Sequence, residues 1–336
     1  MIVAAFLLAA VFTRSLERVG TIVPSEAQSA YDARAVQLVY ETILSIDYTK
    51  RPYELRPGFC ELPKMSADSL GYTFKTRNGA SAELVVATLE SLRDGKKVSP
   101  NGWIMKNVDT VRAIDAETIE VRLKKKTHYF PWLMAMSACA VIGPGGEPTA
   151  DYELSSWRRN HEMVFKRRRG RERPQAFDTI RYLVVDDVST QWLMFLKGEL
   201  DMLGEISRDN WDAVIGADGK LDARLAAEGM TLYTMPTLEI MYLGFNMRDP
   251  VVGSNRKLRQ ALNAAFDYPA WEKFYNFRIV PAGGPVPQGV DGCIATPFEY
   301  FSDLEKAKKL IAEGQKVSVI LGFNTESEIF YENEFR

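Results

Sequence analysis

Histidine and cysteine are scarce in this 336-residue chain, which has two of the former, His128 and His161, and three of the latter. The cysteines, Cys60, Cys139 and Cys293, lie far apart, and no C-x-x-C pair occurs. A zinc site with the usual ligand spacing is therefore not expected, and neither a metal nor a cofactor is predicted. A disulfide between Cys293 and either of the other two stays open, because sequence does not show which thiols meet.

Sequence signatures of the common enzyme classes are also missing. The chain contains no G-x-S-x-G, H-E-x-x-H, G-x-x-x-x-G-K-[ST] or G-x-G-x-x-G motif. Its Gly-rich stretches, residues 143–148 and 282–289, include proline and lack the strand-to-helix setting of a phosphate loop, so both are interpreted as turns. Asp186 and Asp187 are adjacent and would point to opposite faces of a strand, which sets up no acid–base pair. We expect no catalytic residue and no enzymatic activity.

The chain also lacks a strong charge of either sign. Its 42 Lys and Arg against 44 Asp and Glu give a net charge of −2. Such a chain has no overall field that draws it to nucleic acid or to an anionic membrane, and no nucleic-acid partner is predicted. The run KRRRGRER at residues 166–173 is the strongest local basic feature. A patch for nucleic acid or an acidic partner is one interpretation of it, and a solvated loop between strands is the favoured one.

Long hydrophobic runs are absent except at the start. Residues 2–12 form an apolar run of eleven, which suits the central region of a secretory signal and is too short to span a bilayer. No Lys or Arg precedes the run and no clean A-x-A site follows it, so a buried first element is the alternative. We treat residues 1–14 as a possible signal segment.

What is present is an alternation of strand and helix patterns, which predicts an α/β fold. Strands show apolar residues at every second position, as do Ile119, Val121 and Leu123, and helices show them at steps of three and four. The predicted elements up to residue 197 are a strand at 18–24, a helix at 35–47, a strand around 72–76, a helix before residue 94, two strands within 108–126, a strand at 179–185 and a helix at 188–197.

The region from Tyr242 to Gly289 is the most informative part. It begins with a predicted strand, residues 240–246, that ends in Asn. A polar Asp-Pro loop follows, then a helix opened by Asn255 and carrying KLRQALNAAFD, then a segment rich in Gly and Pro. Nearer the C-terminus, Ser302 and Glu305 have the S-x-x-E spacing of a capping box before another helix.

This order resembles the extracellular solute-binding proteins of ABC importers, family 5, of the oligopeptide- and dipeptide-binding type. The matching pieces are the Y-x-x-F-N strand, the R-Q-A-L-x-x-A-x-D helix and the P-A-x-G-P-x-P-x-G segment, with a G-E-x-D string at residues 198–201. The chain departs from the family in a shortened loop after Arg77 and in PTADYELSSW, which stands where members have G-T-G-P-Y/F. It also stops where members continue.

The resemblance implies a periplasmic-binding-protein-like fold of two lobes with hinge strands, the second lobe incomplete. Residues 15–240 would form the first lobe, and 241–336 the hinge strand and part of the second. It further implies that the protein captures a peptide or other small solute between the lobes and delivers it to ABC transporter permease subunits. The protein would then contact the membrane only through that permease. Its location would be periplasmic or extracytoplasmic, and it would be a monomer. The alternative is a truncated fragment of such a protein that does not transport. The hypothesis that the chain is an enzyme is less favoured than either.

Six ligand-binding residues are expected from the same resemblance. In a strand over 240–246, one face carries a phenol, a bare backbone and an amide, while Met241, Leu243 and Phe245 face the other way. That polar face suits a peptide that adds main-chain hydrogen bonds to a strand. A plain sheet with a solvated second face is the equal alternative. Two further candidates follow the first strand, and one lies in the loop after residues 198–201. The expected set is Tyr242, Gly244, Asn246, Ser25, Tyr31 and Glu205.

Overall fold

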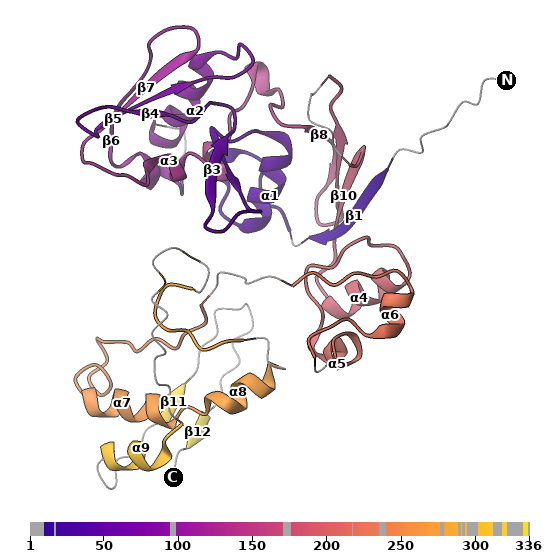
Figure 1. Cartoon of the computed structure of the whole chain (residues 1–336), viewed down its shortest axis with the longest axis vertical. Coiled ribbons are helices and arrows are strands. Elements are labelled where there is room, and N and C mark those ends of the chain that lie inside the picture. Colours follow the sequence, from indigo (N-terminus) through magenta and orange to yellow (C-terminus); the bar gives the residue numbers. More distant parts are fainter. Residues whose placement is uncertain are drawn as a thin grey trace, which may run out of the picture. The chain divides into compact units, whose positions relative to one another are not determined.

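The structure is a computed structural model that divides into two compact units, each described here by itself (Figure 1). Unit 1 comprises Met1–Gly216 and Leu221–Leu225, and unit 2 comprises Ala217–Lys220 and Ala226–Arg336. The expected lobe boundary after residue 240 falls within unit 2. The described residues are 10–16, 18–94, 99–170, 176–216, 218–234, 240–275, 279–287, 290, 293, 302–311, 318–320 and 332–334.

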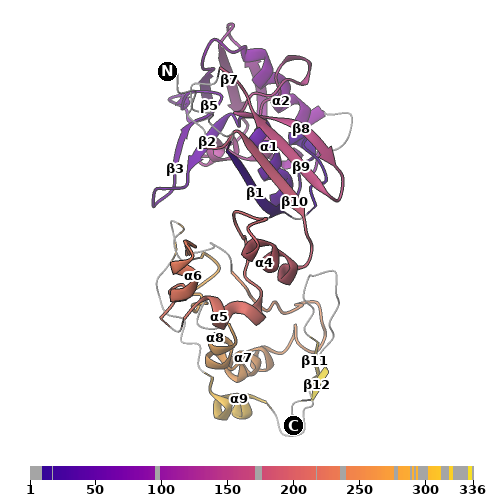
Figure 2. The ribbon, with the colours of Figure 1, turned by 90° about the vertical axis from the view of Figure 1, so that its right-hand side faces the viewer.

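One four-stranded sheet of unit 1 joins the start of the chain to a segment far along it (Figure 2). Its order is β1-β10-β9-β8, and only the β1–β10 pair is parallel. Val11 pairs with Thr179 and Leu16 with Val184, so the register holds over the whole of β1. The strands are β1 (Val11–Leu16), β8 (Tyr152–Arg158), β9 (Glu162–Arg167) and β10 (Thr179–Val184).

The helix α1 (Ala30–Val39) packs against this sheet through residues at helical spacing. Ala35, Val36 and Val39 are buried in one core with Phe165 of β9 and Tyr182 of β10. The helix predicted at 35–47 is therefore wrong in extent, since it starts earlier and ends at Val39. The residues after it leave the helix because they find strand partners: β2 (Leu44–Asp47) pairs antiparallel with β3 (Glu54–Pro57).

The strand predicted at residues 18–24 is also wrong, because the first strand comes earlier, at β1. Residues 18–23 form no strand and lead into the short 3-10 turn η1 (Pro24–Glu26). Residues 11–14 of the possible signal segment belong to β1, and residues 1–9 lie outside the described residues.

A second four-stranded sheet of unit 1 has the order β4-β5-β7-β6 and packs against α2 (Ala82–Asp94). It confirms the predicted strand around 72–76 and the two within 108–126, with Tyr72, Phe74, Ile119 and Val121 buried. Its strands are β4 (Lys64–Met65), β5 (Gly71–Lys75), β6 (Val108–Ala113) and β7 (Thr118–Leu123).

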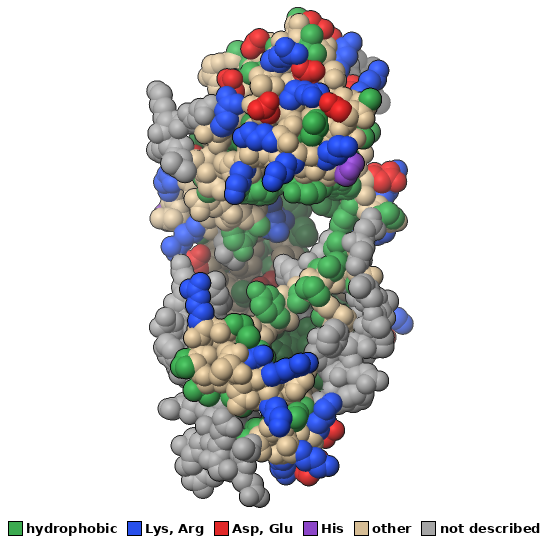
Figure 3. Space-filling view, turned by 90° about the vertical axis from the view of Figure 1, so that its left-hand side faces the viewer, with side chains coloured by type: hydrophobic (Ala, Val, Ile, Leu, Met, Phe, Trp, Pro, Cys, Tyr) green, Lys and Arg blue, Asp and Glu red, His purple; other side chains and the backbone are tan. Residues whose placement is uncertain are grey.

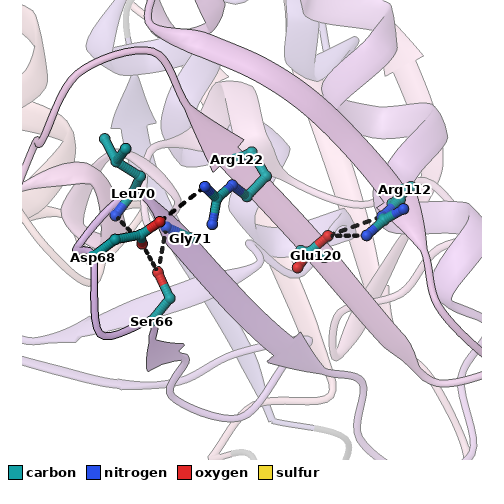
Figure 4. Close-up of polar contacts among 7 residues, drawn as sticks. All are labelled: Ser66, Asp68, Leu70, Gly71, Arg112, Glu120 and Arg122. Carbon is teal, nitrogen blue, oxygen red and sulfur yellow. Dashed lines mark hydrogen bonds and ion pairs between the residues drawn. The ribbon is translucent and has the colours of Figure 1, made fainter.

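The other face of this sheet carries charges that neutralise one another (Figure 4). Arg112 contacts Glu120 at 2.6 Å and Arg122 contacts Asp68 at 2.9 Å. Hydrogen bonds from Ser66, from the Leu70 amide and from Arg122 lower the pKa of Asp68 to about 2. Figure 3 shows basic and acidic side chains intermingled in the same way on the surface of unit 1, at the top of the view.

Short helices complete unit 1, and α4 (Val188–Leu196) confirms the helix predicted at 188–197. Asp187 caps it by accepting the Thr190 amide proton at 2.7 Å, and Trp192 is its buried residue. The others are η2 (Gly102–Met105), α3 (Phe130–Leu133), η3 (Ser137–Cys139), η4 (Pro144–Gly146), η5 (Arg208–Asn210), α5 (Trp211–Val214) and the start of α6 (Ala223–Ala227).

In unit 2 the predicted cap at Asn255 is confirmed: its side chain accepts the Leu258 amide proton at 3.0 Å and starts α7 (Arg256–Ala265). The capping box predicted at Ser302 and Glu305 is wrong, because Asp303 caps α9 (Leu304–Leu310) and Ser302 instead donates to the Phe266 carbonyl. The remaining elements are α8 (Tyr268–Phe274), β11 (Ser318–Ile320) and β12 (Glu332–Glu334).

The strand predicted at residues 240–246 is wrong in this structure. These residues form no strand, since no described segment of the chain pairs with them. Large side chains are exposed on both faces of the expected strand: Tyr242 on one face, and Met241, Leu243 and Phe245 on the other. The sequence alternates as a strand does, but no described neighbouring strand supplies the hydrogen bonds that would place residues 240–246 in a sheet.

All three cysteines are free, so neither open disulfide pairing forms. Cys60 and Cys139 are buried, and burial raises the pKa of both thiols to about 12. Thiols in that environment are structural rather than reactive.

Candidate functional site

The loop that follows β1 is held by one buried carboxylate. Asp32, in the first turn of α1, is only 5% exposed. Its Oδ1 accepts the amide protons of Gly20 and Thr21, and its Oδ2 accepts those of Gln28 and Ser29. Ser29 in turn accepts the Asp32 amide proton at 3.0 Å, which completes a capping box. Both ends of the loop 20–29 are thereby fixed to a single side chain.

Two effects oppose each other on the pKa of Asp32. Burial acts to raise it, and the backbone hydrogen bonds from Ser29, Gly20, Gln28 and Thr21 act to lower it. The hydrogen bonds prevail and the pKa lies below its ordinary value. The carboxylate is therefore ionised at neutral pH, as its acceptor role requires.

Ser25 and Tyr31, two of the expected ligand-binding residues, lie on this loop and on α1 directly after it. Ser25 is in η1, and its carbonyl accepts a hydrogen bond from the Ser99 hydroxyl. The nearby Ala27 carbonyl accepts one from Asn101 Nδ2 at 2.7 Å. Tyr31 is half-buried on α1, with the Arg34 guanidinium 5.8 Å from its ring centroid. The loop and the first turn of α1 thus hold these two residues in fixed positions.

A small pocket lies beside this loop, at the carboxyl ends of β1 and β10. In open α/β sheets, ligands bind at the carboxyl ends of parallel strands. The Arg159 guanidinium lies 4.4 Å from the Trp157 ring centroid and donates to the Gly20 carbonyl at 3.4 Å. The pocket therefore combines apolar walls with guanidinium groups at its rim. Its lining residues are Leu16, Arg18, Val19, Trp157, Arg159, Asn160, Met163, Tyr182 and Val184.

Glu205, the third expected residue in unit 1, lies on an exposed loop after residues 198–201. This loop runs beside β1, since Met202 forms a bridge with Arg14 and the Thr13 amide donates to Asp201 at 2.6 Å. Close approach continues at Gly204, where a Cβ atom would lie 3.3 Å from Arg14 Nη2. The structure thus places Glu205 in the segment that passes the Arg14 side chain.

The other three expected residues lie in unit 2 and do not share the face of a strand. Tyr242 is 80% exposed, and its ring approaches the position of a Cβ on Gly244 to 3.5 Å. The Asn246 side chain accepts the Arg248 amide proton at 3.1 Å and so begins the turn that follows. The six expected residues therefore form two groups, one in each unit. Within unit 1, the hydrogen bonds and ion pairs of the described residues do not join Glu205 to Ser25 or Tyr31.

Sequence reasoning missed Asp32, Trp157 and Arg159. The first had a signal, because Ser29 and Asp32 have the S-x-x-D spacing that precedes an apolar helix. The other two had none, since only the pairing of β8 and β9 brings the Trp157–Asn160 turn to the end of the sheet.

A comparison with models of known protein families assigns the chain to a family. The model of bacterial extracellular solute-binding proteins, family 5 middle, matches residues 54–319. The chain belongs to this family. The family is one of bacterial extracellular solute-binding proteins.

Curated relatives of family 5 agree with this assignment. The glutathione-binding protein GsiB of Escherichia coli K12 is 25% identical over 319 residues, which cover 87% of this chain and 59% of that protein. The GsiB of E. coli O1:K1 is 26% identical over the same coverage. The chain therefore spans about three fifths of the length of the curated relatives it matches.

Solved structures show the same two-lobed α/β fold. DppA of Helicobacter pylori in complex with the peptide STSA has a TM-score of 0.69 at 18% identity and is covered to 65%. The murein tripeptide binding protein MppA of Escherichia coli has a TM-score of 0.72 at 19% identity and is covered to 66%. Each alignment includes 90% of this chain, so the predicted fold class is confirmed.

Within the described residues, none of the helices combines the length and the apolar composition needed to cross a membrane.

Proposed function

We propose that this family 5 chain binds a peptide or a peptide-like solute such as glutathione outside the cytoplasmic membrane and delivers it to an ABC importer. The observation that carries the proposal is the family match over residues 54–319. The relatives support the solute class, since one is named for glutathione and another is solved with the peptide STSA. Chemistry on the solute and a cofactor are not part of the proposal.

The described residues supply two kinds of contact for such a solute. Unit 1 offers Ser25 on a loop that Asp32 fixes in advance and Tyr31 in the first turn of the helix that follows. A fixed loop loses less conformational freedom when a ligand binds. Unit 2 offers the exposed segment 240–246, whose strand-like pattern has no described partner strand. An extended peptide can supply that partner through its own main chain, with Tyr242 and Asn246 beside it.

Binding becomes transport when the solute favours a closed conformation that the permease recognises. A ligand shifts such an equilibrium only by the difference between its contacts in the two states. In this proposal the partners are the solute and the permease subunits, the protein meets the membrane only through the permease, and it acts as a monomer in the periplasm or an equivalent extracytoplasmic space.

Thermal unfolding tests the proposal. With glutathione or a pool of di- to hexapeptides at about 100 times the dissociation constant, the free energy of unfolding should rise by about 2.7 kcal/mol. The midpoint should increase by several degrees, since 1 kcal/mol shifts it by about 2–4 °C in proteins of about 150–250 residues and by somewhat less in longer chains. Maltose at the same concentration serves as the control solute. A cooperative transition that none of these peptides or glutathione shifts would contradict the proposed solute class.

A variant pair tests the role of unit 2. Tyr242→Ala should weaken peptide binding by about 10-fold, the effect of losing one well-packed aromatic contact of about 1.4 kcal/mol. It should leave the unliganded midpoint unchanged, because Tyr242 is 80% exposed. The matched control is Tyr233→Ala, which removes a tyrosine of the same unit that is 83% exposed. Isothermal titration with one tripeptide compares the two, and equal affinities would remove Tyr242 from the site.

A further inference from the structure

The chain contains two Asn-Gly pairs, Asn78-Gly79 and Asn101-Gly102, whose surroundings in the structure differ. Asparagine is one of the thermolabile residues of proteins, because its side-chain amide can be lost in a reaction with the next backbone nitrogen. Glycine as the next residue favours this reaction, since it has no Cβ atom to hinder its own nitrogen and its backbone rotates freely. The hydrogen bonds and exposure of each pair then decide which of them can react.

The first pair forms the exposed tip of the turn between β5 and α2. Both Asn78 and Gly79 are exposed, and both have positive φ, 55° and 68°. The Ala80 amide donates to the Arg77 carbonyl at 3.1 Å and closes the turn around them. Positive φ at both central residues is the mark of a type I′ turn. A Cβ atom added at Gly79 would have no neighbour within 4 Å, so the tip projects into open space.

The base of this turn is fixed while its tip is not. Arg77 donates from its amide to the Phe59 carbonyl at 3.1 Å and from Nη1 to the Gly58 carbonyl at 3.0 Å. In contrast, no described residue accepts a hydrogen bond from the Gly79 amide, and the Asn78 side chain makes no described hydrogen bond. Opening the bond that closes the turn would therefore free the tip and leave the rest of unit 1 folded.

The second pair is engaged at both of the groups that would have to react. The Gly102 amide donates to the Ser99 carbonyl at 3.0 Å, and Asn101 Nδ2 donates to the Ala27 carbonyl at 2.7 Å. Both residues are half-buried, and a Cβ atom added at Gly102 would lie 3.1 Å from the Leu92 carbonyl oxygen. The nitrogen that would attack and the side chain that would be attacked are thus both held in place.

A third asparagine separates exposure from the effect of the glycine. Asn160 lies in the turn between β8 and β9, is exposed and has a φ of 61°, as Asn78 has one of 55°. The next residue is His161, whose side chain crowds its own nitrogen and whose amide donates to the Arg158 carbonyl at 3.0 Å. Only the Asn78 pair combines an exposed asparagine, a following glycine and an amide without a described acceptor.

We propose that Asn78 is a site of spontaneous deamidation. The Gly79 backbone nitrogen attacks Asn78 Cγ, and the new N–C bond closes a succinimide ring. The bond from Cγ to the side-chain nitrogen breaks, and that nitrogen leaves as ammonia with the proton that the Gly79 amide loses. Water then adds to either carbonyl of the ring and opens it, which leaves aspartate or isoaspartate at position 78.

The modification changes the turn in two ways. Each product has a carboxylate where the neutral amide was, so the exposed tip gains one negative charge. In the isoaspartate product the main chain also runs through the side-chain carbon, which lengthens the turn. The spacing that allows the Ala80 amide to reach the Arg77 carbonyl is then lost.

Peptide mapping of the aged full chain tests the proposal. One sample is kept folded in mildly alkaline buffer and a second is kept in urea, and both are cut after glutamate. The peptides 62–83, 91–117 and 154–162 then carry Asn78, Asn101 and Asn160 separately, and fragmentation spectra locate each loss of an amide. In the folded chain Asn78 should react at least about 10-fold faster than Asn101, whose pair must first break two further hydrogen bonds. In urea the two Asn-Gly pairs should react at similar rates.

Charge variants give a second readout. Isoelectric focusing should show a new acidic band in aged wild type and in the matched control Asn101→Gln. The band should be much weaker in Asn78→Gln, because glutamine has to close a larger ring. Equal rates at Asn78 and Asn101 in the folded chain would overturn the proposal, as would an unreacted Asn78 in the folded chain while both pairs react in urea. An acidic band of wild-type intensity in Asn78→Gln would overturn it as well.

Discussion

Replacing Asp32 by alanine is expected to lower the free energy of unfolding by about 3–4 kcal/mol, because four backbone amides of a part-buried loop lose one charged acceptor. The loop 20–29 and the first turn of α1 would lose their common anchor together. Urea unfolding followed by circular dichroism measures the change. Asp187→Ala is the matched control, since Asp187 accepts a single backbone amide at the start of α4, and such a cap contributes about 1 kcal/mol.

The pH dependence of this effect has a definite sign. The pKa of Asp32 is lowered on folding, so its stabilising contribution is present above the pKa of an unfolded aspartate, about 3.9, and is lost as the pH falls toward the folded value. The difference in stability between wild type and Asp32→Asn should therefore be full at pH 7 and smaller at pH 3. A difference that stays constant over that range would mean that the ionised carboxylate is not what holds the loop.

Replacing Phe165 by alanine should lower the free energy of unfolding by about 3–5 kcal/mol, the usual range when a fully buried ring is removed and a cavity is left. Phe165 of β9 has no exposed surface and packs edge-on against Tyr182 with 5.4 Å between ring centroids. The cavity would open beneath α1 and next to the pocket at the end of β10, so binding of a solute should weaken along with stability.

Phe177→Ala provides the comparison for Phe165→Ala. Phe177 precedes β10 and pairs with Phe12 at 4.9 Å, but it is only half-buried. Phe177→Ala should lower the free energy of unfolding by less than half as much as Phe165→Ala, because water can reach the space that the Phe177 ring leaves. Thermal unfolding of the two variants measures the difference, and equal costs would show that the core between α1 and the sheet is not the main support of unit 1.

Local patterns predicted the elements that depend on local interactions. The α4 helix and the cap at Asn255 need only neighbours within one turn, and both are confirmed. The helix over 35–47 failed because residues 44–47 pair with residues 54–57, a contact that periodicity does not reveal. The strand at 240–246 failed for the converse reason, since a strand pattern forms a strand only where a second segment supplies hydrogen bonds.

The candidate site divides in the same way. Family resemblance directed attention to Ser25, Tyr31 and Glu205, which lie in unit 1, and to the segment around Tyr242 in unit 2. It gave no reason to consider Trp157 and Arg159, which the pairing of β8 with β9 brings to the end of the sheet. A side chain near the end of a strand shows in sequence only which face it takes relative to its neighbours.

The parallel pairing of β1 with β10 also governs when unit 1 can finish folding. The backbone of Ala10 reaches Asp178, a separation of 168 residues, so the first strand has no sheet partner until nearly two hundred residues have been made. At about 5–20 residues per second, that wait is on the order of ten seconds or more. Contacts of such long range slow folding, and β1 stays without its partner strand throughout that interval.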